Sequence, residues 1–216
     1  MAHALGLGRR GMGQCWPNPA VGCVIVRDGR VVGRGWTQPG GRPHAETVAL
    51  EQAGEAARGA TAYVTLEPCA HHGKTPPCCE ALVAAGIACV VAPIADSDPR
   101  VDGQGFDYLR KHGVDVTTGI GAEQALLDHA GFFLRLSQGR PWVTLKLAMT
   151  LDGRIATATG ESQWITGPAA RRAVHGLRAT HDAVMVGAGT ARADDPQLTV
   201  RGLATASSLY ASSCRA

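Results

Sequence analysis

The sequence predicts an α/β protein in two parts: a sheet covered by helices on both faces, followed by a second, shorter α/β part. Three observations support this prediction. After an initial hairpin, strand-like apolar runs alternate with helical segments, an order typical of sheets with parallel strands. Gly139-Arg140-Pro141 interrupts the alternation and marks a boundary. A new strand-like run then begins at Trp142.

The first part opens with a hairpin and then alternates. Residues 21–26 are apolar and largely β-branched, and Asp28-Gly29 is a strong turn signal before a second strand at Val31-Val32. Pro43 stands at the start of an Ala-, Glu- and Leu-rich helix over residues 45–57, which Gly59 ends. Further strands are expected at residues 61–66, 87–92, 114–117, 142–149 and 183–186, and further helices at residues 76–85, 106–111 and 123–137.

These elements divide the chain into three segments. We expect a first domain at residues 1–139 and a second at residues 140–202. Residues 203–216 show no strand alternation, and we expect them to form a disordered tail.

Composition narrows the class of protein. A chain of 216 residues with 45% hydrophobic and 18% charged residues is ordinary for a globular protein with a buried core. The net charge of +3 is small and scattered, which argues against a nucleic-acid surface. Residues 1–13 lack the apolar core of a signal peptide, and no apolar run reaches membrane-spanning length. Seven unevenly spaced cysteines fit metal-binding thiols better than a disulfide framework, so we expect a cytoplasmic protein.

The motif that carries chemistry begins at His44-Ala45-Glu46 and continues with Pro68-Cys69 and Cys78. One imidazole and two thiolates leave the fourth tetrahedral position of Zn²⁺ open, as in catalytic zinc sites. Zinc in such a site lowers the pKa of water to roughly 7. A nearby carboxylate, here Glu46, can then take and return a proton without binding the metal. His-x-Glu with a later Pro-Cys-x-x-Cys is the signature of zinc nucleobase deaminases, so the motif predicts hydrolytic deamination.

The spacing of His44 and Glu46 restricts where they can meet. Residues two apart do not face each other within a regular helix, so we expect this pair in the irregular first turn after Pro43. A second helix should begin around Pro76-Pro77. The positive ends of both helix dipoles would then favour a thiolate at Cys78.

Other cysteines offer alternatives to this ligand set. Cys79 could replace Cys78 as a ligand, although we expect Cys79 to pack inward. Cys15, Cys23 and Cys89 belong to no motif and are expected to act as small apolar residues.

Longer stretches carry a family resemblance. Residues 17–26 read Pro-Asn-Pro-Ala-Val-Gly-Cys-Val-Ile-Val, and within residues 65–79 the run His-His-Gly-Lys-Thr-Pro-Pro lies between the cysteine ligands. That long insertion resembles the bifunctional riboflavin-biosynthesis deaminase/reductase family, whereas tRNA adenosine and cytidine deaminases have tighter spacing. Residues 144–153, 160–166 and 193–201 are similar to the start of that family's reductase domain.

The resemblance implies a fold and a reaction. The fold would be a cytidine-deaminase-like three-layer α/β/α domain followed by an incomplete dihydrofolate-reductase-like α/β domain. The first domain would use Zn²⁺ to deaminate 2,5-diamino-6-(5-phosphoribosylamino)pyrimidin-4(3H)-one. The product, 5-amino-6-(5-phosphoribosylamino)uracil, would be reduced by NADPH in an intact second domain.

The resemblance also assigns residues in the first domain. His44, Cys69 and Cys78 match the zinc ligands, and Glu46 matches the catalytic carboxylate. Substrate contacts are expected from residues in two loops, with a turn-stabilising or solvated role as the alternative for each. These residues are Asn18, His71 and Lys74, of which Lys74 is the expected partner of the substrate phosphate.

In the second domain, Gly187-Ala188-Gly189-Thr190 follows an apolar run and could bring backbone amides close to a phosphate. Family positions near NADP(H) match Ala148, Trp164, Thr190 and Asp194. Family positions near the reductase substrate match Ser162, Arg178, Leu198 and Arg201. Trp164 could equally be a core residue, and Arg178 a solvated helix residue.

After Arg201 the sequence departs from the family pattern. We therefore expect a chain that deaminates but does not reduce, and whose unpaired strands favour self-association into a homo-oligomer. Two other functions compete with this interpretation. One is a nucleic-acid base deaminase, which the missing basic, aromatic-rich surface and the long cysteine spacing disfavour. The other is a non-catalytic, zinc-binding remnant, which no motif excludes.

Overall fold

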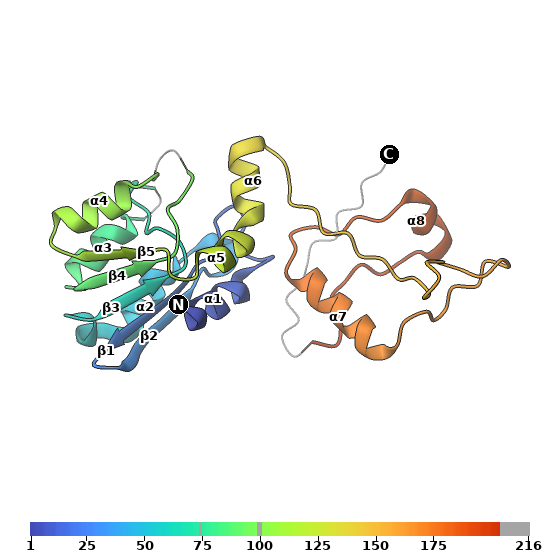
Figure 1. Cartoon of the computed structure of the whole chain (residues 1–216), viewed down its shortest axis with the longest axis horizontal. Helices are drawn as coiled ribbons and strands as arrows, with labels where there is room; N and C mark the ends of the chain where they lie inside the picture. Colours follow the sequence, from blue (N-terminus) through green and yellow to red (C-terminus); the bar gives the residue numbers. More distant parts are fainter. Residues whose placement is uncertain (74, 99–100, 204–216) are drawn as a thin grey trace. The chain divides into compact units, whose positions relative to one another are not determined.

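The computed structural model describes residues 1–73, 75–98 and 101–203 (Figure 1). The chain divides into two compact units, Met1–Trp142 and Val143–Ala216, which are treated separately below. Lys74 and most of the expected tail, residues 204–216, lie outside the described residues.

The first unit contains one five-stranded sheet in the order β2-β1-β3-β4-β5. The hairpin strands and β3 are antiparallel neighbours, whereas β3, β4 and β5 run parallel. The hairpin turns at Asp28 and Gly29, which both have positive φ, as the tight two-residue turn requires. The strands are β1 (Gly22–Arg27), β2 (Arg30–Trp36), β3 (Thr61–Val64), β4 (Cys89–Ala92) and β5 (Asp115–Thr118).

Helices cover both faces of this sheet, which gives three layers (Figure 1). The helices of the first unit are α1 (Ala2–Gly8), α2 (Ala45–Ala53), α3 (Cys78–Ala84), α4 (Gln104–Lys111), α5 (Ala122–Asp128) and α6 (Ala130–Gln138). Short 3-10 turns occupy Arg9–Gly11, Pro39–Gly41 and Gly54–Ala57. No helix in the described part of the chain is both long and apolar enough to cross a membrane.

The first unit has two hydrophobic cores, one on each face of the sheet. Successive strand residues point to opposite faces, so neighbouring residues of one strand belong to different cores. On β1, Cys23 and Ile25 join the larger core beneath α2, α3 and α4. Val24, between them, packs with Ala4 and Leu7 of α1 on the other face.

Glycines on β2 let α2 approach the sheet closely. A Cβ at Gly35 would lie 2.1 Å from the carbonyl oxygen of Ala45, and one at Gly33 would lie 2.2 Å from that of Ala49. Any side chain at these positions would push the helix away. The contact at Ala45 therefore fixes the first turn of α2, which carries His44 and Glu46.

Most of the elements predicted for the first unit are confirmed, including the hairpin and the parallel strands covered on both faces. One difference concerns the helix expected at residues 123–137. The chain forms two helices there, α5 and α6, separated by His129, whose ring is buried. Apolar spacing did not reveal the break, because each half keeps a helical period.

The second unit corrects two predictions. Residues 142–149 and 183–186 were expected to be strands, but neither forms a strand among the described residues. A strand requires a hydrogen-bonding neighbour, and none of the described segments pairs with either run. Their apolar side chains are accordingly exposed, by 77% at Leu145 and 82% at Met185. The unit's helices are α7 (Pro168–Ala179) and α8 (Ala188–Asp194).

Candidate metal centre

Three side chains converge in the first unit with the spacing of a metal site. The Nδ1 atom of His44 lies 3.3 Å from Sγ of Cys78 and 3.7 Å from Sγ of Cys69. All three ligand atoms lie within 4.8 Å of one another. Tetrahedral zinc with ordinary Zn–N and Zn–S bonds would separate its ligand atoms by about 3.6–3.8 Å. The donor set and its dimensions therefore fit Zn²⁺ with one position left for another ligand.

The secondary structure explains this convergence. His44 is the N-cap of α2 and has extended backbone angles (φ −70°, ψ 159°), so it lies outside the regular helix that contains Glu46. Cys69 follows β3, and Cys78 is the first residue of α3. His44 and Glu46 thus lie at the irregular start of α2, where the sequence placed them, and their sharing of one catalytic site stays a prediction.

Asn18 contacts the His44 ring at Nε2, the nitrogen that does not face the thiols. Its Nδ2 atom donates to the carbonyl oxygen of Gly41 over 2.7 Å and lies 3.2 Å from Nε2 of His44. Partners of this kind orient a ligand histidine and commonly accompany metal sites. Asn18 thereby keeps Nδ1 directed at the two thiols. A direct contact between Asn18 and substrate stays a prediction.

The two thiols share one proton unequally. A hydrogen bond from the Cys78 thiol lowers the pKa of Cys69 to about 4, whereas this pairing and burial raise the pKa of Cys78. The hydrogen bond with Cys69 also raises the pKa of His44. Cys69 is therefore the preformed thiolate of the set. Metal binding would displace the remaining proton, as it does at zinc sites generally.

Glu46 lies beside this cluster without belonging to it. Its side chain is only 4% exposed, and burial raises the pKa of its carboxyl, against the opposing effect of the nearby His44. The group of potential ligands comprises His44, Cys69 and Cys78. A buried carboxyl with a raised pKa takes up a proton more readily than an exposed one, which suits it to acid–base exchange.

Glu67 is a second buried acidic side chain, and both of its oxygens are occupied by backbone donors. Oε1 accepts the backbone N–H groups of Gly105 and Phe106, and Oε2 accepts those of Asp96 and Gly103. Four donors occupy all the lone pairs that a carboxylate offers. Sequence reasoning did not single out Glu67, although it lies two residues before Cys69.

Asp96 is a third buried acid that was not predicted. It follows the carboxyl end of β4, and burial raises its pKa to about 6. The charges of Glu67 and Cys69 act on it in the same direction. Polar residues just after parallel strands often line sites, which is the signal that could have indicated Asp96.

The loop between the cysteine ligands borders the site. Nδ1 of His71 is buried and has no hydrogen-bond partner among the residues the structure describes. Nη1 of Arg42 donates to Oγ1 of Thr75 at 2.5 Å, which ties this loop to the residue two before His44. The predicted phosphate contact of Lys74 lies outside the described residues. The role of His71 toward substrate stays a prediction.

The other described cysteines were predicted to pack as small apolar residues, and most of them are buried. Cys79 is buried in the main core, and burial raises its pKa to about 11, so it packs inward and stays protonated. Cys15 and Cys23 are also buried, whereas Cys89 is half-buried.

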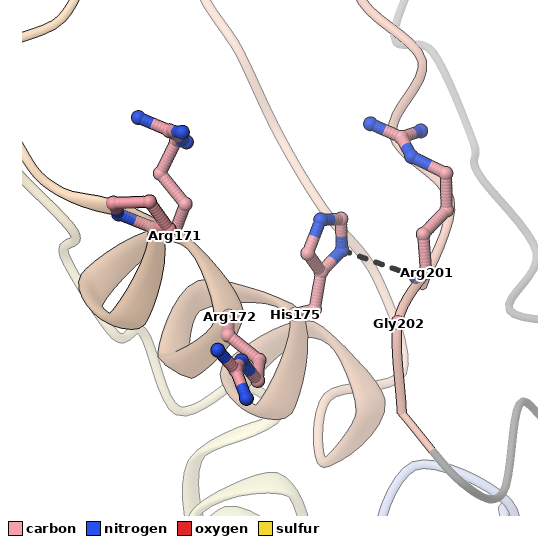
Figure 2. A pocket seen from close by; sticks show the side chains of 6 residues that line it. Arg171, Arg172, His175, Arg201 and Gly202 are labelled. Atoms are coloured by element: carbon pink, nitrogen blue, oxygen red, sulfur yellow. Dashed lines mark hydrogen bonds between the residues drawn. The ribbon is translucent and has the colours of Figure 1, made fainter.

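The second unit has a cation-lined pocket on α7. Figure 2 shows Arg171, Arg172 and His175 on α7, with His175 directed toward Arg201, whose backbone N–H donates to Nδ1 of His175 over 3.2 Å. An adjoining pocket is lined by Trp164 and Arg178 together with Arg171 and Arg201. The guanidinium of Arg171 lies 4.3 Å from the centre of the Trp164 ring.

Three of the residues predicted for the second domain, Trp164, Arg178 and Arg201, thus line one pocket. Trp164 is 69% exposed and is not a core residue. Thr190 and Asp194 lie together on α8, after Gly187 as N-cap. The lining residues do not include Ala148, Ser162, Thr190, Asp194 or Leu198.

Comparison with known families matches both parts of the chain. Residues 1–93 match the cytidine and deoxycytidylate deaminase zinc-binding region, which contains all three clustered ligands. Residues 141–208 match the RibD C-terminal domain. The Escherichia coli riboflavin biosynthesis protein RibD is 55% identical over 201 residues, or 93% of this chain.

The chain is similar to RibD proteins in both of its parts.

Similar proteins from other bacteria match nearly the whole chain. RibD of Aquifex aeolicus is 48% identical over 205 residues, or 95% of this chain. The solved structure of Acinetobacter baumannii RibD has a TM-score of 0.87 at 48% identity and covers 98% of this chain. A Thermotoga maritima diaminohydroxyphosphoribosylaminopyrimidine deaminase/5-amino-6-(5-phosphoribosylamino)uracil reductase has a TM-score of 0.91 at 42% identity and covers 99%.

The match covers only part of each relative. The chain spans 55% of the E. coli protein, 58% of the A. aeolicus protein and 61% of either solved RibD-type chain. The predicted fold class is confirmed: a deaminase-like domain followed by a segment of a RibD C-terminal domain.

Proposed function

We propose that this chain is a zinc-dependent deaminase of 2,5-diamino-6-(5-phosphoribosylamino)pyrimidin-4(3H)-one. The observation that carries the proposal is the cluster of His44, Cys69 and Cys78 with the buried Glu46 beside it. The substrate class rests on the deaminase named for the T. maritima relative. The product would be 5-amino-6-(5-phosphoribosylamino)uracil and ammonia.

His44, Cys69 and Cys78 would hold the zinc ion. When bound, zinc supplies a polarised water that is nucleophilic at neutral pH. Glu46 accepts a proton from the attacking water as the water's oxygen adds to the ring carbon bearing the exocyclic amine. Glu46 then delivers a proton to that amine, and the carbon–nitrogen bond breaks to release ammonia. The raised pKa of Glu46 suits this double role, because the carboxyl must both gain and lose a proton.

The loops around the centre would bind the rest of the substrate. We assign Asn18 and His71 to the pyrimidine side, and Lys74 to the phosphate. The buried Nδ1 of His71 has no hydrogen-bond partner within the described part of the chain, which supports its assignment, because an unpaired buried nitrogen is costly unless a ligand satisfies it.

We propose domain limits of 1–139 and 140–202, followed by the tail at 203–216, and a cytoplasmic location without membrane or nucleic-acid partners. NADP(H) would bind an intact second domain through Ala148, Trp164, Thr190 and Asp194, and the reductase substrate through Ser162, Arg178, Leu198 and Arg201. We propose that the first domain carries out the deaminase step, and that exposed apolar runs such as residues 142–149 favour homo-oligomers.

The decisive experiment is an ammonia-release assay on the purified, zinc-loaded 216-residue chain with the phosphoribosyl substrate. We expect one ammonia per substrate consumed and no release from chain treated with a chelator. A zinc-loaded chain that releases no ammonia would instead support a non-catalytic zinc-binding remnant. Release from single-stranded nucleic acid but not from the small molecule would support a nucleic-acid base deaminase.

A further inference from the structure

The buried side chain of Glu67, two residues before Cys69, binds the backbone of a segment that lies far along the chain. Its two oxygens accept four backbone N–H groups at 2.9–3.1 Å, all from residues 29 to 39 positions later. The side chain is only 3% exposed. Its own N–H donates to the carbonyl oxygen of Ile94 over 3.2 Å. The same residue thus holds both ends of the segment from β4 to the start of α4.

The contact is tight enough to require glycine in α4. A Cβ at Gly105 would lie 2.1 Å from the carbonyl oxygen of Pro68 and 3.1 Å from Oε1 of Glu67. The first turn of α4 therefore rests directly on the Glu67-Pro68 backbone. Because the positive end of a helix dipole favours a nearby anion, the charge of Glu67 also stabilises this arrangement.

These contacts of Glu67 and Pro68 lie immediately before the potential ligand Cys69 in the sequence. On its other side, Cys69 is held by α3: its carbonyl oxygen accepts the N–H of Cys79 at 3.2 Å, and its Sγ accepts the N–H of Cys78 at 3.3 Å. The backbone of Cys69 is consequently fixed from two directions, by α3 after it and by Glu67 before it.

We infer that Glu67 is a positioning residue for the metal centre, setting the place of the Cys69 thiolate through the Glu67-Pro68-Cys69 backbone. This inference rests on the proposed function to the extent that the centre holds zinc. Glu67 is not one of the potential metal ligands, and its two oxygens are occupied by four backbone donors. Its effect should appear in how firmly zinc is held.

Glu67→Gln is the sharpest test, because it preserves shape and replaces one oxygen with an NH₂ group. Either orientation of the amide places that NH₂ group against two backbone N–H donors, so two hydrogen bonds are lost. We expect zinc release to a chelator to become about tenfold to a hundredfold faster, the usual effect of losing a partner behind a metal ligand. Glu51→Gln, on the exposed face of α2, is the matched control and should release zinc like the wild type.

Release should be followed well below the melting temperature, where circular dichroism shows the variant folded. A role confined to overall stability would lower the melting temperature but leave zinc release from the folded protein unchanged. Cobalt(II) substitution adds a second measurement. The thiolate-to-cobalt absorption band should shift in Glu67→Gln and not in Glu51→Gln.

Two further variants apply if Glu67→Gln does not fold. Glu67→Asp keeps the charge but shortens the reach, and Gly105→Ala pushes α4 away from Pro68. Both should release zinc faster than the wild type. If the folded variants release zinc at the wild-type rate and their cobalt band does not shift, the positioning role of Glu67 is wrong, while the proposed function is unaffected. A wild-type chain that takes up no zinc would refute the proposed function, and this role with it.

Discussion

The backbone N–H of Cys78, the first residue of α3, donates a hydrogen bond to the Sγ of Cys69 over 3.3 Å. This bond links the two cysteines of the cluster directly. A hydrogen bond from the Cys78 thiol is the main cause that lowers the pKa of Cys69 to about 4, and the backbone N–H of Cys78 acts in the same direction. The protein thus holds one thiolate in place before any metal arrives. The imidazole of His44, oriented by Asn18, faces both sulfurs.

Cys69→Ser should remove most of the bound zinc. Serine keeps the size of the side chain but replaces the thiolate with a hydroxyl that stays protonated and binds zinc poorly. Metal analysis of the purified chain should give about one zinc per wild-type molecule and far less for the variant. Cys89→Ser, a half-buried thiol on β4 outside the cluster, should keep its zinc. Full zinc retention by Cys69→Ser would contradict the ligand set.

Glu46→Gln should retain zinc and lose deamination. The amide is nearly isosteric but cannot accept and return a proton, so turnover should fall by at least about 10²-fold. Zinc content and ammonia release are measured on the same preparation, with Glu51→Gln from the same helix as the control. Loss of zinc together with activity would instead make Glu46 a ligand or a structural support.

Lys74→Ala should weaken binding of the phosphorylated substrate selectively. The ammonium of Lys74 is expected to pair with the phosphate, so KM should rise more for the phosphorylated substrate than for its dephosphorylated analogue. Lys111→Ala, at the exposed end of α4, is the control. Equal effects of Lys74→Ala on both substrates would remove the phosphate role.

His129 should make the stability of the first unit depend on pH. Its ring is 2% exposed, and burial lowers its pKa to about 4, against weaker opposing effects of Thr65 and Asp128. An unfolded histidine titrates near 6.5, so the unfolded chain binds the extra proton first as the pH falls. This contribution to stability is complete above pH 6.5 and is lost as the pH falls toward 4.

Between pH 7 and pH 5 the loss should amount to about 2 kcal/mol in the free energy of unfolding. Urea unfolding of the wild type and of His129→Gln at both pH values measures it, because effects of other groups, including acid release of zinc, cancel in the difference. A wild-type-minus-variant difference that does not change with pH would show that His129 titrates normally.

The 216-residue chain should not oxidise NADPH with the deaminated substrate. A dinucleotide site must hold its parts on paired strands, and the described residues of the second unit contain helices but no strand. NADPH fluorescence titration, followed by absorbance in the presence of substrate, checks this directly. Saturable binding with substrate-dependent oxidation would show that the second unit forms a working site.

Local chemistry explains why the metal ligands were predictable. His44, Cys69 and Cys78 were identified because residue types and spacing specify a zinc ligand set. The hairpin at Asp28-Gly29 followed from turn residues that tolerate positive φ. The structure confirms the hairpin and brings the three side chains together.

Contacts between distant segments explain what the sequence did not reveal. The four donors to Glu67 come from residues far along the chain, and no local pattern marks them. The break at His129 depends on a ring buried by packing rather than on helical period.

The sequence by itself determined the chemistry of the site and the order of elements in the first unit, because both depend on residue type and short-range spacing. Only the tertiary structure decided which apolar runs become strands. Residues 61–64 and 89–92 pair with each other and form β3 and β4, whereas residues 142–149 have no described partner and stay exposed. An extended segment becomes a strand only when a neighbour satisfies its backbone N–H and C=O groups.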